Sequence, residues 1–349
     1  MKSQNVVDAG RRLLLGAGLG GLALGVAPIR ALAQSGAPGQ LLNVSYDVAR
    51  ELYAQINPAF VADWKARTGQ AVSILQSHDG SSKQARAVAD GLQADVVTLN
   101  QVTDINFLQK AGLVAAGWQS RFPNRASPAY SLPVMLVRAG NPKAIHDWGD
   151  LGRPGVQVVM TNPKTSGNGR YAYLANFAWG LEKSGGDEAK ARELVGRVFA
   201  NVPLFDTGGR GASASFVERG LGDALITFES EVHAILRQYP AAGLQSVVPP
   251  VSVRADFPVA VVDAVVDRHG TRQLATAYLQ FLFSEAGQEI LASNFNRVID
   301  AAVIKRHAAG FPQVRLVTVE ERFGGWDAVA SRHFADGGLL DQVLAQVPK

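Results

Sequence analysis

Apolar and polar positions follow two rhythms in the first part of the chain. The apolar run LLNVSY (41–46) predicts a buried strand, and AVSILQ (71–76) alternates with the two-residue period of a strand. Between them, apolar residues recur every four positions from Leu52 to Trp64, which predicts a helix over 48–67. Strands that alternate with helices indicate βαβ units and a mostly parallel sheet, so the expected fold class is α/β.

The same succession continues to the end of the chain. The pattern predicts strands at 94–100, 156–161 and 224–230, a loop at 162–170, helices at about 171–181 and 187–202, an extended segment at 251–266, a long helix at 271–294 and a polar C-terminal tail. A second set of strands and helices begins near residue 131, which indicates two lobes.

Residues 1–33 are organised like an export signal. Arg11 and Arg12 precede a Gly- and Leu-rich apolar run, and Ala31-Leu32-Ala33 has the small-residue pattern of a cleavage site. The run is shorter than a membrane-spanning helix requires, and the paired arginines favour the twin-arginine route. We therefore expect a soluble, exported protein that is located in the periplasm.

Charge and composition exclude several classes of partner and chemistry. The 349 residues contain no cysteine, so disulfides and thiolate chemistry are excluded. Residues 1–33 hold four of the 34 basic residues and one of the 30 acidic ones, so the remaining chain is nearly neutral. Because it also lacks the basic stripe typical of nucleic-acid binders, we expect no nucleic-acid partner.

Four predicted strand-to-helix junctions carry glycine and small polar residues where a helix begins. They are Ser45-Tyr46-Asp47, Gly80-Ser81-Ser82, Ser166-Gly167-Asn168 and Thr207-Gly208-Gly209. The first N–H groups of a helix have no carbonyl partner within it, and this end carries about half a positive elementary charge. Glycine allows a ligand to approach the backbone. Each junction is therefore a candidate anion site.

A single junction of this kind is weak evidence, because Gly/Ser turns are commonly ordinary helix caps. Ser81 with Gln84 also fits a capping box. Four junctions, two in each predicted lobe and all at the carboxyl ends of strands, favour convergence on one ligand. Neutral donors suit a fully ionised tetrahedral oxyanion, whose dehydration must be offset by many aligned hydrogen bonds.

Sequence motifs of enzymes and metal sites are missing. The six histidines form no H-x-x-x-H or H-E-x-x-H pattern, there is no G-x-S-x-G, and GSSK (80–83) lacks the spacing of a phosphate-binding P-loop. We expect no catalysis, no cofactor and no metal. A periplasmic enzyme that acts on an anionic substrate is the alternative from a different class.

Long strings of the chain point to one family. These are LLNVSYDVARELY (41–53), QSHDGSSKQARAV (76–88), WQSRFPNRASPAY (118–130), NPKTSGNGRYAYLANFAWG (162–180), FDTGGRGASASFVERGLGDALITFESE (205–231) and FGGW (323–326). In them the chain closely resembles the periplasmic sulfate/thiosulfate-binding proteins of ABC transporters. The resemblance implies a two-lobed type II periplasmic-binding fold, with an interlobe cleft that closes over a dehydrated sulfate. It also implies a monomer that delivers the anion to membrane permease subunits.

The resemblance also implies where the lobes and ligand contacts lie. We expect lobe 1 at 34–125 and 254–305, lobe 2 at 126–253, and a C-terminal segment at 306–349 that packs back on the lobes. The expected ligand contacts are Asp47, Ser81, Ser166, Gly167, Asn168, Gly209 and Phe228. Ser81 is expected to donate its hydroxyl and Gly209 its N–H. Asp47 is expected to donate its N–H while its side chain organises neighbouring donors, because a bare carboxylate would repel the anion.

Three further residues are expected to support these contacts. They are Gly80, Ser82 and Arg210, and Arg210 is expected to pair with local backbone groups.

The chain departs from the family pattern at several of these positions. It has Asp79-Gly80-Ser81-Ser82 where the family has GGSG, Asn168 where it has glycine, and Gly209 where it has alanine. Phe228 stands where the family has a tryptophan whose indole N–H donates to sulfate, and such a bond is worth about 1.5–3 kcal/mol.

These departures leave the ligand open. Water, Asn168 or Ser82 are the candidate substitutes for the missing indole donor, and Asp79 could accept the O–H of a protonated ligand. Another oxyanion (molybdate, phosphate or an organic sulfonate) is therefore the alternative to sulfate or thiosulfate.

Overall fold

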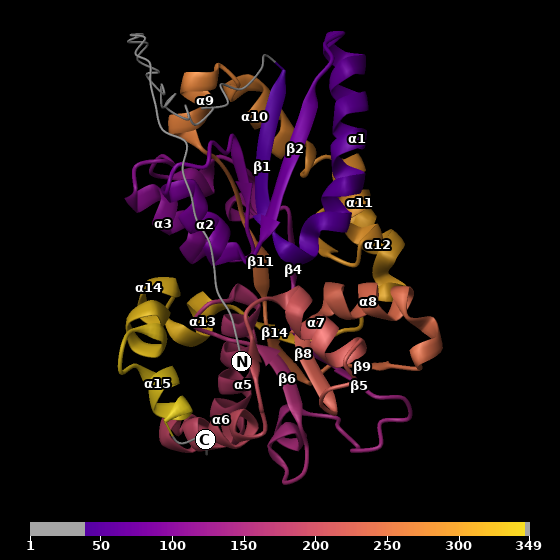
Figure 1. Ribbon diagram of the computed structural model, residues 1–349, viewed down its shortest axis with the longest axis vertical. Helices are drawn as coiled ribbons and strands as arrows, with labels where there is room; N and C mark the ends of the chain where they lie inside the picture. Colours follow the sequence, from indigo (N-terminus) through magenta and orange to yellow (C-terminus); the bar gives the residue numbers. More distant parts are fainter. Residues whose placement is uncertain (1–38, 346–349) are drawn as a thin grey trace, which may run out of the picture. The chain divides into compact units, whose positions relative to one another are not determined.

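The computed structural model describes residues 39–345, so the predicted export signal at 1–33 lies outside the described residues. A four-stranded sheet forms the centre of lobe 1 (Figure 1). In order across the sheet, its strands are β12 (Val259–Val261), β3 (Val96–Thr98), β1 (Gln40–Tyr46) and β2 (Ser73–Asp79). β1 is parallel to β2 and β3, and β12 is antiparallel to β3. This agrees with the mostly parallel sheet that the sequence predicted.

Helices join the parallel strands of this sheet. The short 3-10 helix η1 (Asp47–Ala49) leads into α1 (Arg50–Thr68), which connects β1 to β2. After β2, α2 (Ser81–Ala89) leads to β3, and α3 (Val102–Lys110) follows β3. The predicted apolar face of α1 is confirmed, because Leu52, Ile56, Phe60 and Trp64 are all buried.

A five-stranded sheet forms the centre of lobe 2. In order, its strands are β7 (Phe205–Asp206), β6 (Val158–Thr161), β8 (Ala224–Phe228), β5 (Pro133–Val137) and β9 (Gln245–Val247). β6 is parallel to β7 and β8, whereas β5 is antiparallel to β8 and β9. Its helices are α5 (Gly167–Lys183), α6 (Glu188–Ala200), α7 (Gly209–Val217) and α8 (Glu229–Gln238).

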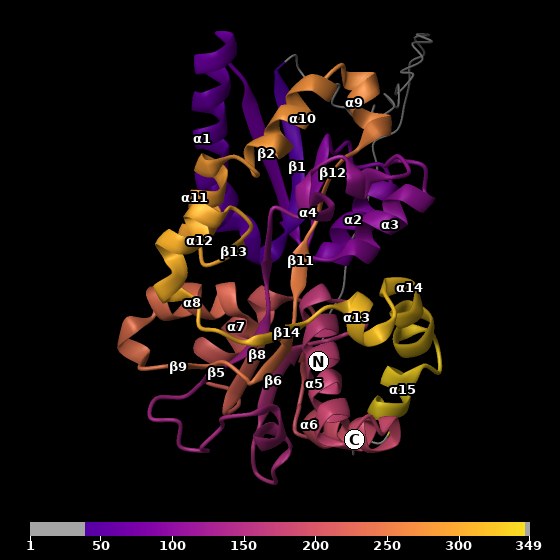
Figure 2. The ribbon, with the colours of Figure 1, turned by 180° about the vertical axis from the view of Figure 1, so that it is seen from behind.

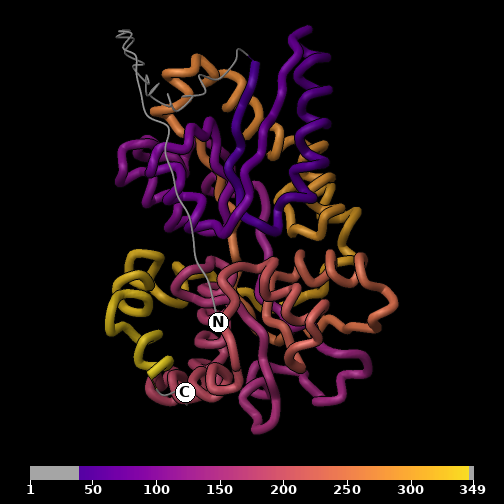
Figure 3. The backbone as a smooth tube through the Cα atoms, in the orientation of Figure 1, coloured from indigo at the N-terminus to yellow at the C-terminus, as the bar shows by residue number. Residues whose placement is uncertain are grey.

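Short strands link the two sheets. β4 (Ala129–Ser131) pairs with β11 (Ala255–Phe257) and with β13 (Arg297–Val298), and β10 (Val251–Val253) pairs with β14 (Arg315–Val317). The chain passes from lobe 1 to lobe 2 along β4 and β5 and returns along β10, β11 and β12, as the tube in Figure 3 shows. These two passages lie side by side, because β4 pairs with β11, and the chain crosses a third time between β13 and β14.

The remaining elements are short. They are α4 (Pro123–Ala126), α9 (Asp263–His269), α10 (Arg272–Phe281), α11 (Glu285–Ser293), α12 (Ala301–His307), α13 (Val319–Phe323), α14 (Trp326–Val329), α15 (Leu339–Leu344), the 3-10 helices η2 (Trp118–Ser120), η3 (Trp148–Gly152), η4 (Pro240–Ala242) and η5 (Ala308–Gly310), and the π-helix η6 (Ala330–Phe334).

Two segments near the end of lobe 1 differ from their predicted secondary structure. The extended segment predicted at 251–266 ends at Val261, and α9 begins at Asp263, because the buried Val265 and Val266 pack in helical geometry. The single helix predicted at 271–294 is two helices. The Ser284 hydroxyl accepts the N–H of Gly287 at 3.2 Å and starts α11, which separates it from α10.

The C-terminal segment is polar in composition, but it is mostly helical and packs on α5 and α6 (Figure 2). Trp326 of the FGGW string is buried with its ring edge against Tyr171, at a centroid distance of 5.2 Å. Farther along, Lys164 pairs with Asp341 at 2.8 Å. Apolar residues spaced along short helices account for the packing that the polar composition concealed.

Among the helices of residues 39–345, none has both the length and the apolar character needed to cross a membrane.

Candidate functional site

Helix α5 begins at Gly167, within the junction Ser166-Gly167-Asn168 and four residues before the start at about 171 that the apolar pattern predicted. Gly167, Asn168 and Gly169 therefore lie in its first turn, where no carbonyl within the helix accepts their N–H groups. Two glycines in three residues disfavour a helix, but a Cβ added at Gly169 would lie 2.5 Å from the carbonyl oxygen of Thr161. The close packing of α5 on the end of β6 therefore requires glycine at position 169. This packing places the N-terminus of α5 at the edge of lobe 2.

This N-terminus meets lobe 1 at Asn100, just beyond β3. A Cβ added at Gly167 would lie 2.2 Å from Asn100 Oδ1 and 3.2 Å from Gln101 Cδ. The backbone N–H of Asn100 donates to Ser81 Oγ at 3.2 Å. Ser81 and Gly167, which the sequence predicted on different lobes, thus lie on two sides of one asparagine.

Ser81 and Ser82 occupy the first turn of α2 and share one partner. Their hydroxyls donate to the two carboxylate oxygens of Asp104, at 2.6 and 2.8 Å. Asp104 is buried, and burial raises its pKa, although the serine hydrogen bonds and the nearby Arg170 oppose the rise. The single hydroxyl hydrogen of Ser81 is therefore directed at Asp104. The predicted donation to an anion requires this hydroxyl to turn, or Asp104 to hold a proton.

The predicted capping box at Ser81 is wrong. Gly80 is the N-cap residue of α2, and no side chain caps the helix there. The carboxamide of Gln84 instead exchanges hydrogen bonds with the Ser77 hydroxyl. The serines are free of a capping role because Asp104 approaches from α3.

The start of α7 meets lobe 1 through Asp47. Asp47 Oδ2 accepts the backbone N–H of Arg210 at 3.1 Å, and a Cβ added at Gly208 would lie 3.0 Å from the same oxygen. A Cβ added at Gly209 would lie 3.7 Å from Asn168 Nδ2, so the first turns of α5 and α7 are neighbours. The carboxylate of Asp47 thus holds the start of α7 beside the start of α5.

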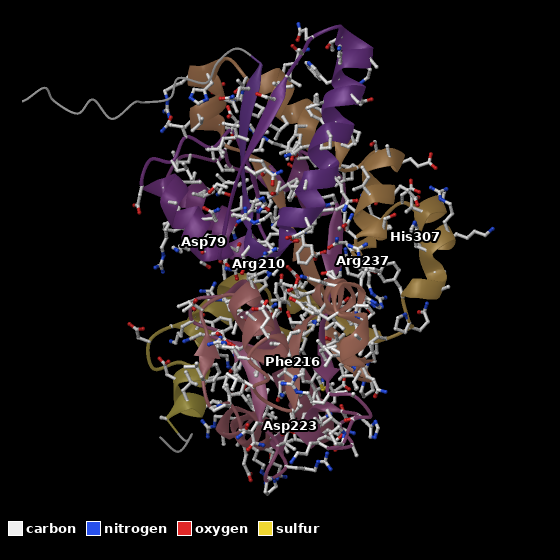
Figure 4. The ribbon with its side chains drawn as sticks, turned by 45° about the vertical axis from the view of Figure 1, so that its right-hand side comes forward. Asp79, Arg210, Phe216, Asp223, Arg237 and His307 are labelled. Carbon is white, nitrogen blue, oxygen red and sulfur yellow. The ribbon has the colours of Figure 1, made fainter. Side chains whose placement is uncertain are left out.

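Arg210 differs from its predicted role. Its guanidinium pairs with the carboxylate of Glu51 on α1, and not with local backbone groups. Both side chains are more than half exposed, and Figure 4 shows Arg210 at the level where the two lobes face each other. The pair therefore connects α7 of lobe 2 with α1 of lobe 1.

Ser166 and Phe228 have fewer hydrogen-bond donors available for a ligand than the other predicted contacts. The N–H of Ser166 donates to the carbonyl oxygen of Asn162 at 2.9 Å, so its hydroxyl is the donor that remains, and this hydroxyl makes no capping bond. Phe228 is fully buried, with its ring 6.0 Å from that of Tyr171 and 5.4 Å from that of Phe257. Its side chain can contribute only apolar contact.

The structure does not favour Asp79 as an acceptor for a protonated ligand. Its carboxylate accepts the N–H of Gly80 at 2.8 Å and pairs with Lys83 at the surface. Partial burial raises the pKa of Asp79, but the hydrogen bonds from Lys83 and Gly80 outweigh it and lower the pKa overall. The carboxyl group is therefore ionised and already partnered.

Sequence reasoning missed the polar side chains that follow β3. Asn100, Gln101 and Asp104 are all buried, and Arg170 of α5 reaches across to Gln101 Oε1 and Thr103 Oγ1, both at 3.3 Å. The signal was the string LNQVTD (99–104), because polar residues directly after a buried strand lie at its carboxyl end, where ligands bind in such sheets.

Glu231 was also missed, because it lies within an ordinary amphipathic helix. Burial raises its pKa to about 7, the nearby carboxylates of Asp47 and Glu51 add to the rise, and a hydrogen bond from Ser213 opposes it. Glu231 lines a cavity of about 410 Å³ that also includes Arg210. Ser81, Ser166 and Gly167 do not line this cavity, so the starts of α2 and α5 lie outside it.

We expect the Glu231→Gln variant to be more stable than the unchanged protein at pH 8 and to lose that advantage at pH 5. The folded protein holds the Glu231 proton more tightly than the unfolded chain does, so stability falls as the pH rises from about 4.5 to about 7. A glutamine keeps the acceptor without the charge, and the gain at pH 8 is at most about 3 kcal/mol. Thermal unfolding between pH 5 and 8 measures it.

The exposed Glu193→Gln variant is the matched control and should show no such trend. If the stability difference between Glu231→Gln and the unchanged protein were the same at every pH, Glu231 would not hold its proton more tightly in the folded protein.

Within residues 39–345, no three His, Asp or Glu side chains are grouped so that they could hold a metal ion.

Comparison with known proteins identifies the family of the chain. Residues 35–295 match the family model described as bacterial extracellular solute-binding protein. The chain is 51% identical over 307 residues to a thiosulfate-binding protein of Pseudomonas aeruginosa, covering 87% of this chain and 92% of that protein. It is 46% identical over 304 residues to a sulfate-binding protein of Escherichia coli, with coverage of 87% and 92%.

A solved structure extends the comparison to the fold. The sulfate-binding protein SubI from Mycobacterium tuberculosis superposes with a TM-score of 0.75 at 33% identity, covering 84% of this chain and 98% of that one.

Proposed function

The chain belongs to the bacterial extracellular solute-binding proteins, and from this premise we propose that it is a periplasmic receptor that captures sulfate or thiosulfate between its lobes. It then delivers the anion to the permease of an ABC transporter. The observation that carries the proposal is the meeting of the starts of α2, α5 and α7, from both lobes, around Asn100 and Asn168. Free backbone N–H groups of helix starts are the donors that a small dianion requires.

The proposed ligand contacts are those that the sequence suggested. The amides of Asp47, Gly167, Asn168 and Gly209 donate, Ser166 adds its hydroxyl, and Phe228 contributes apolar contact. Ser81 donates once its hydroxyl turns from Asp104, while Gly80, Ser82 and Arg210 support the loops. No lysine or arginine is required as a counter-ion, because aligned neutral donors and helix ends offset the dehydration of the anion.

Closure of the lobes traps the anion in this proposal. Arg170 with Gln101, Arg210 with Glu51, and Asp47 with the backbone of Arg210 each join one lobe to the other. The lobes are 34–125 with 254–305, and 126–253. Opening breaks these polar contacts, while β4 and β11 bend between the lobes.

The remaining parts of the proposal concern location, partners and chemistry. An export signal at 1–33 delivers the protein to the periplasm, where it works as a monomer and docks on the permease subunits. The ligand is bound and released unchanged, without catalysis. Relatives that are named binding proteins, at 46–51% identity, support this role.

Titration calorimetry with sulfate and with thiosulfate tests the proposed function. We expect saturable binding of at least one of the two anions at one site per chain, with a Kd in the micromolar range or below, together with a rise in melting temperature. Molybdate, phosphate and an organic sulfonate serve as competitors. No heat and no thermal shift at millimolar sulfate and thiosulfate would overturn the proposal, and tighter binding of a competitor would move it to that anion.

A further inference from the structure

Two buried carboxamides at the start of α5 each contain an oxygen without a hydrogen-bond partner. Asn100 is 4% exposed and Asn168 is 3% exposed, and neither Oδ1 atom has a partner among the described residues. A buried polar atom without a partner costs about 1–3 kcal/mol. Two of them on the two sides of one helix N-terminus, one from each lobe, indicate a missing hydrogen-bonding group at this place.

The surroundings of Asn168 allow its carboxamide to act as a donor. Its Nδ2 now donates to Thr227 Oγ1 at 2.8 Å. A hydroxyl can donate as well as accept, so a half-turn of the carboxamide keeps this bond, with Thr227 donating to Asn168 Oδ1. The turn frees the NH2 group, which has two hydrogens to donate. Gly209 lies close by, at the start of the neighbouring helix α7.

Asn100 provides the corresponding group from lobe 1. Its backbone is fixed by the hydrogen bond to Ser81, and its carboxamide lies directly against Gly167. Any side chain at 167 would collide with it, so glycine keeps space for the carboxamide at the helix start. A half-turn places its NH2 group, in place of the oxygen, beside the free amides of α5.

We propose that the carboxamides of Asn100 and Asn168 donate hydrogen bonds to the bound oxyanion, one from each lobe, and that they compensate for the donor that Phe228 cannot supply. This inference rests on the proposed function and names the side chains that set its ligand class. The ligand is an acceptor-only dianion such as thiosulfate or sulfate, because the two NH2 groups and the helix amides can only donate and, among the described residues, the site offers no unpartnered carboxylate to accept a ligand O–H. A protonated phosphate is therefore disfavoured.

Calorimetry with thiosulfate and sulfate on the Asn168→Ala and Asn100→Ala variants tests the proposal. A hydrogen bond to a charged group is worth about 1.5–3 kcal/mol, so each variant should bind the preferred anion about 10- to 100-fold more weakly. The double variant should lose more than either single variant. Melting temperatures without anion show whether a variant is folded.

Asn176 of the same helix supplies a matched control. It is 1% exposed, and neither polar atom of its carboxamide has a partner among residues 39–345. It lies about 12 Å farther along α5, at 1.5 Å per residue. The Asn176→Ala variant should therefore retain the affinity of the unchanged protein.

The outcomes separate this inference from the proposed function. The inference is supported if the unchanged protein binds the anion and the Asn100 and Asn168 variants bind it more weakly, while the Asn176 variant keeps its affinity. Unchanged affinity in both variants overturns it, as does an equal loss in the Asn176 control, which indicates a general packing effect. An unchanged protein that binds neither anion removes the proposed function itself.

Discussion

Replacing Ser166 by aspartate should lower the affinity for sulfate or thiosulfate by at least about a thousandfold while leaving the protein folded. Ser166 is the N-cap residue of α5 and is buried beside the free amides of Gly167 and Asn168. Aspartate is as good an N-cap residue as serine, so its carboxylate would accept these amides itself. It would also repel the dianion, at about 4 kcal/mol per pair of unit charges 4 Å apart at an effective dielectric constant of 20. A thousandfold loss corresponds to about 4 kcal/mol.

Calorimetry on this variant should be paired with Ser284→Asp. Ser284 is the N-cap residue of α11, so the same substitution adds the same charge at a helix start outside the site. The control should keep its affinity. Retained anion binding by Ser166→Asp would mean that the start of α5 is not part of the ligand site.

The largest loss of stability is expected from Glu229→Ala. Glu229 is fully buried at the start of α8, and its carboxylate accepts two hydrogen bonds from Arg297 of β13, at 2.6 and 2.9 Å. Removal of the carboxylate leaves a mostly buried guanidinium without its counter-charge, which costs about 3–5 kcal/mol. Urea unfolding should show a lower midpoint with an unchanged slope.

Glu193→Ala is the control for this substitution. Glu193 pairs with Arg197 on the surface of α6, and both side chains are about 60% exposed, so the loss should stay below about 1 kcal/mol. Equal midpoints for the two variants would show that the buried pair contributes no more than a surface pair.

The spacing of apolar residues along the chain predicted the helices and strands that have one regularly buried face. The four-residue spacing of apolar residues located α1, and the alternation of strands and helices indicated a mostly parallel sheet. The start of α5 was misplaced because glycine disfavours helices in general, whereas here close packing of Gly169 on the end of β6 requires it. A contact between distant segments therefore overrode the local preference.

The sequence predicted the helix starts that form the candidate site, but it did not predict the hydrogen bonds and ion pairs between their side chains. The four glycine- and serine-rich junctions were visible in the sequence. The partners of their side chains were not, because Asp104, Asn100 and Glu51 lie up to 159 positions away from the residues they contact. Ser81 accordingly faces Asp104 instead of an anion, and Arg210 pairs with a carboxylate. Such pairings depend on how the lobes meet.

The position of the anion in a crystal grown with thiosulfate or sulfate, whichever binds more tightly, tests the central claim most directly. Anomalous scattering from sulfur identifies the ion independently of the surrounding density. The account predicts one anion between the starts of α2, α5 and α7, with oxygens about 2.7–3.2 Å from the amide nitrogens of Gly167, Asn168 and Gly209. An anion in the cavity beside Glu231, or on a surface arginine with none between these helix starts, would contradict it.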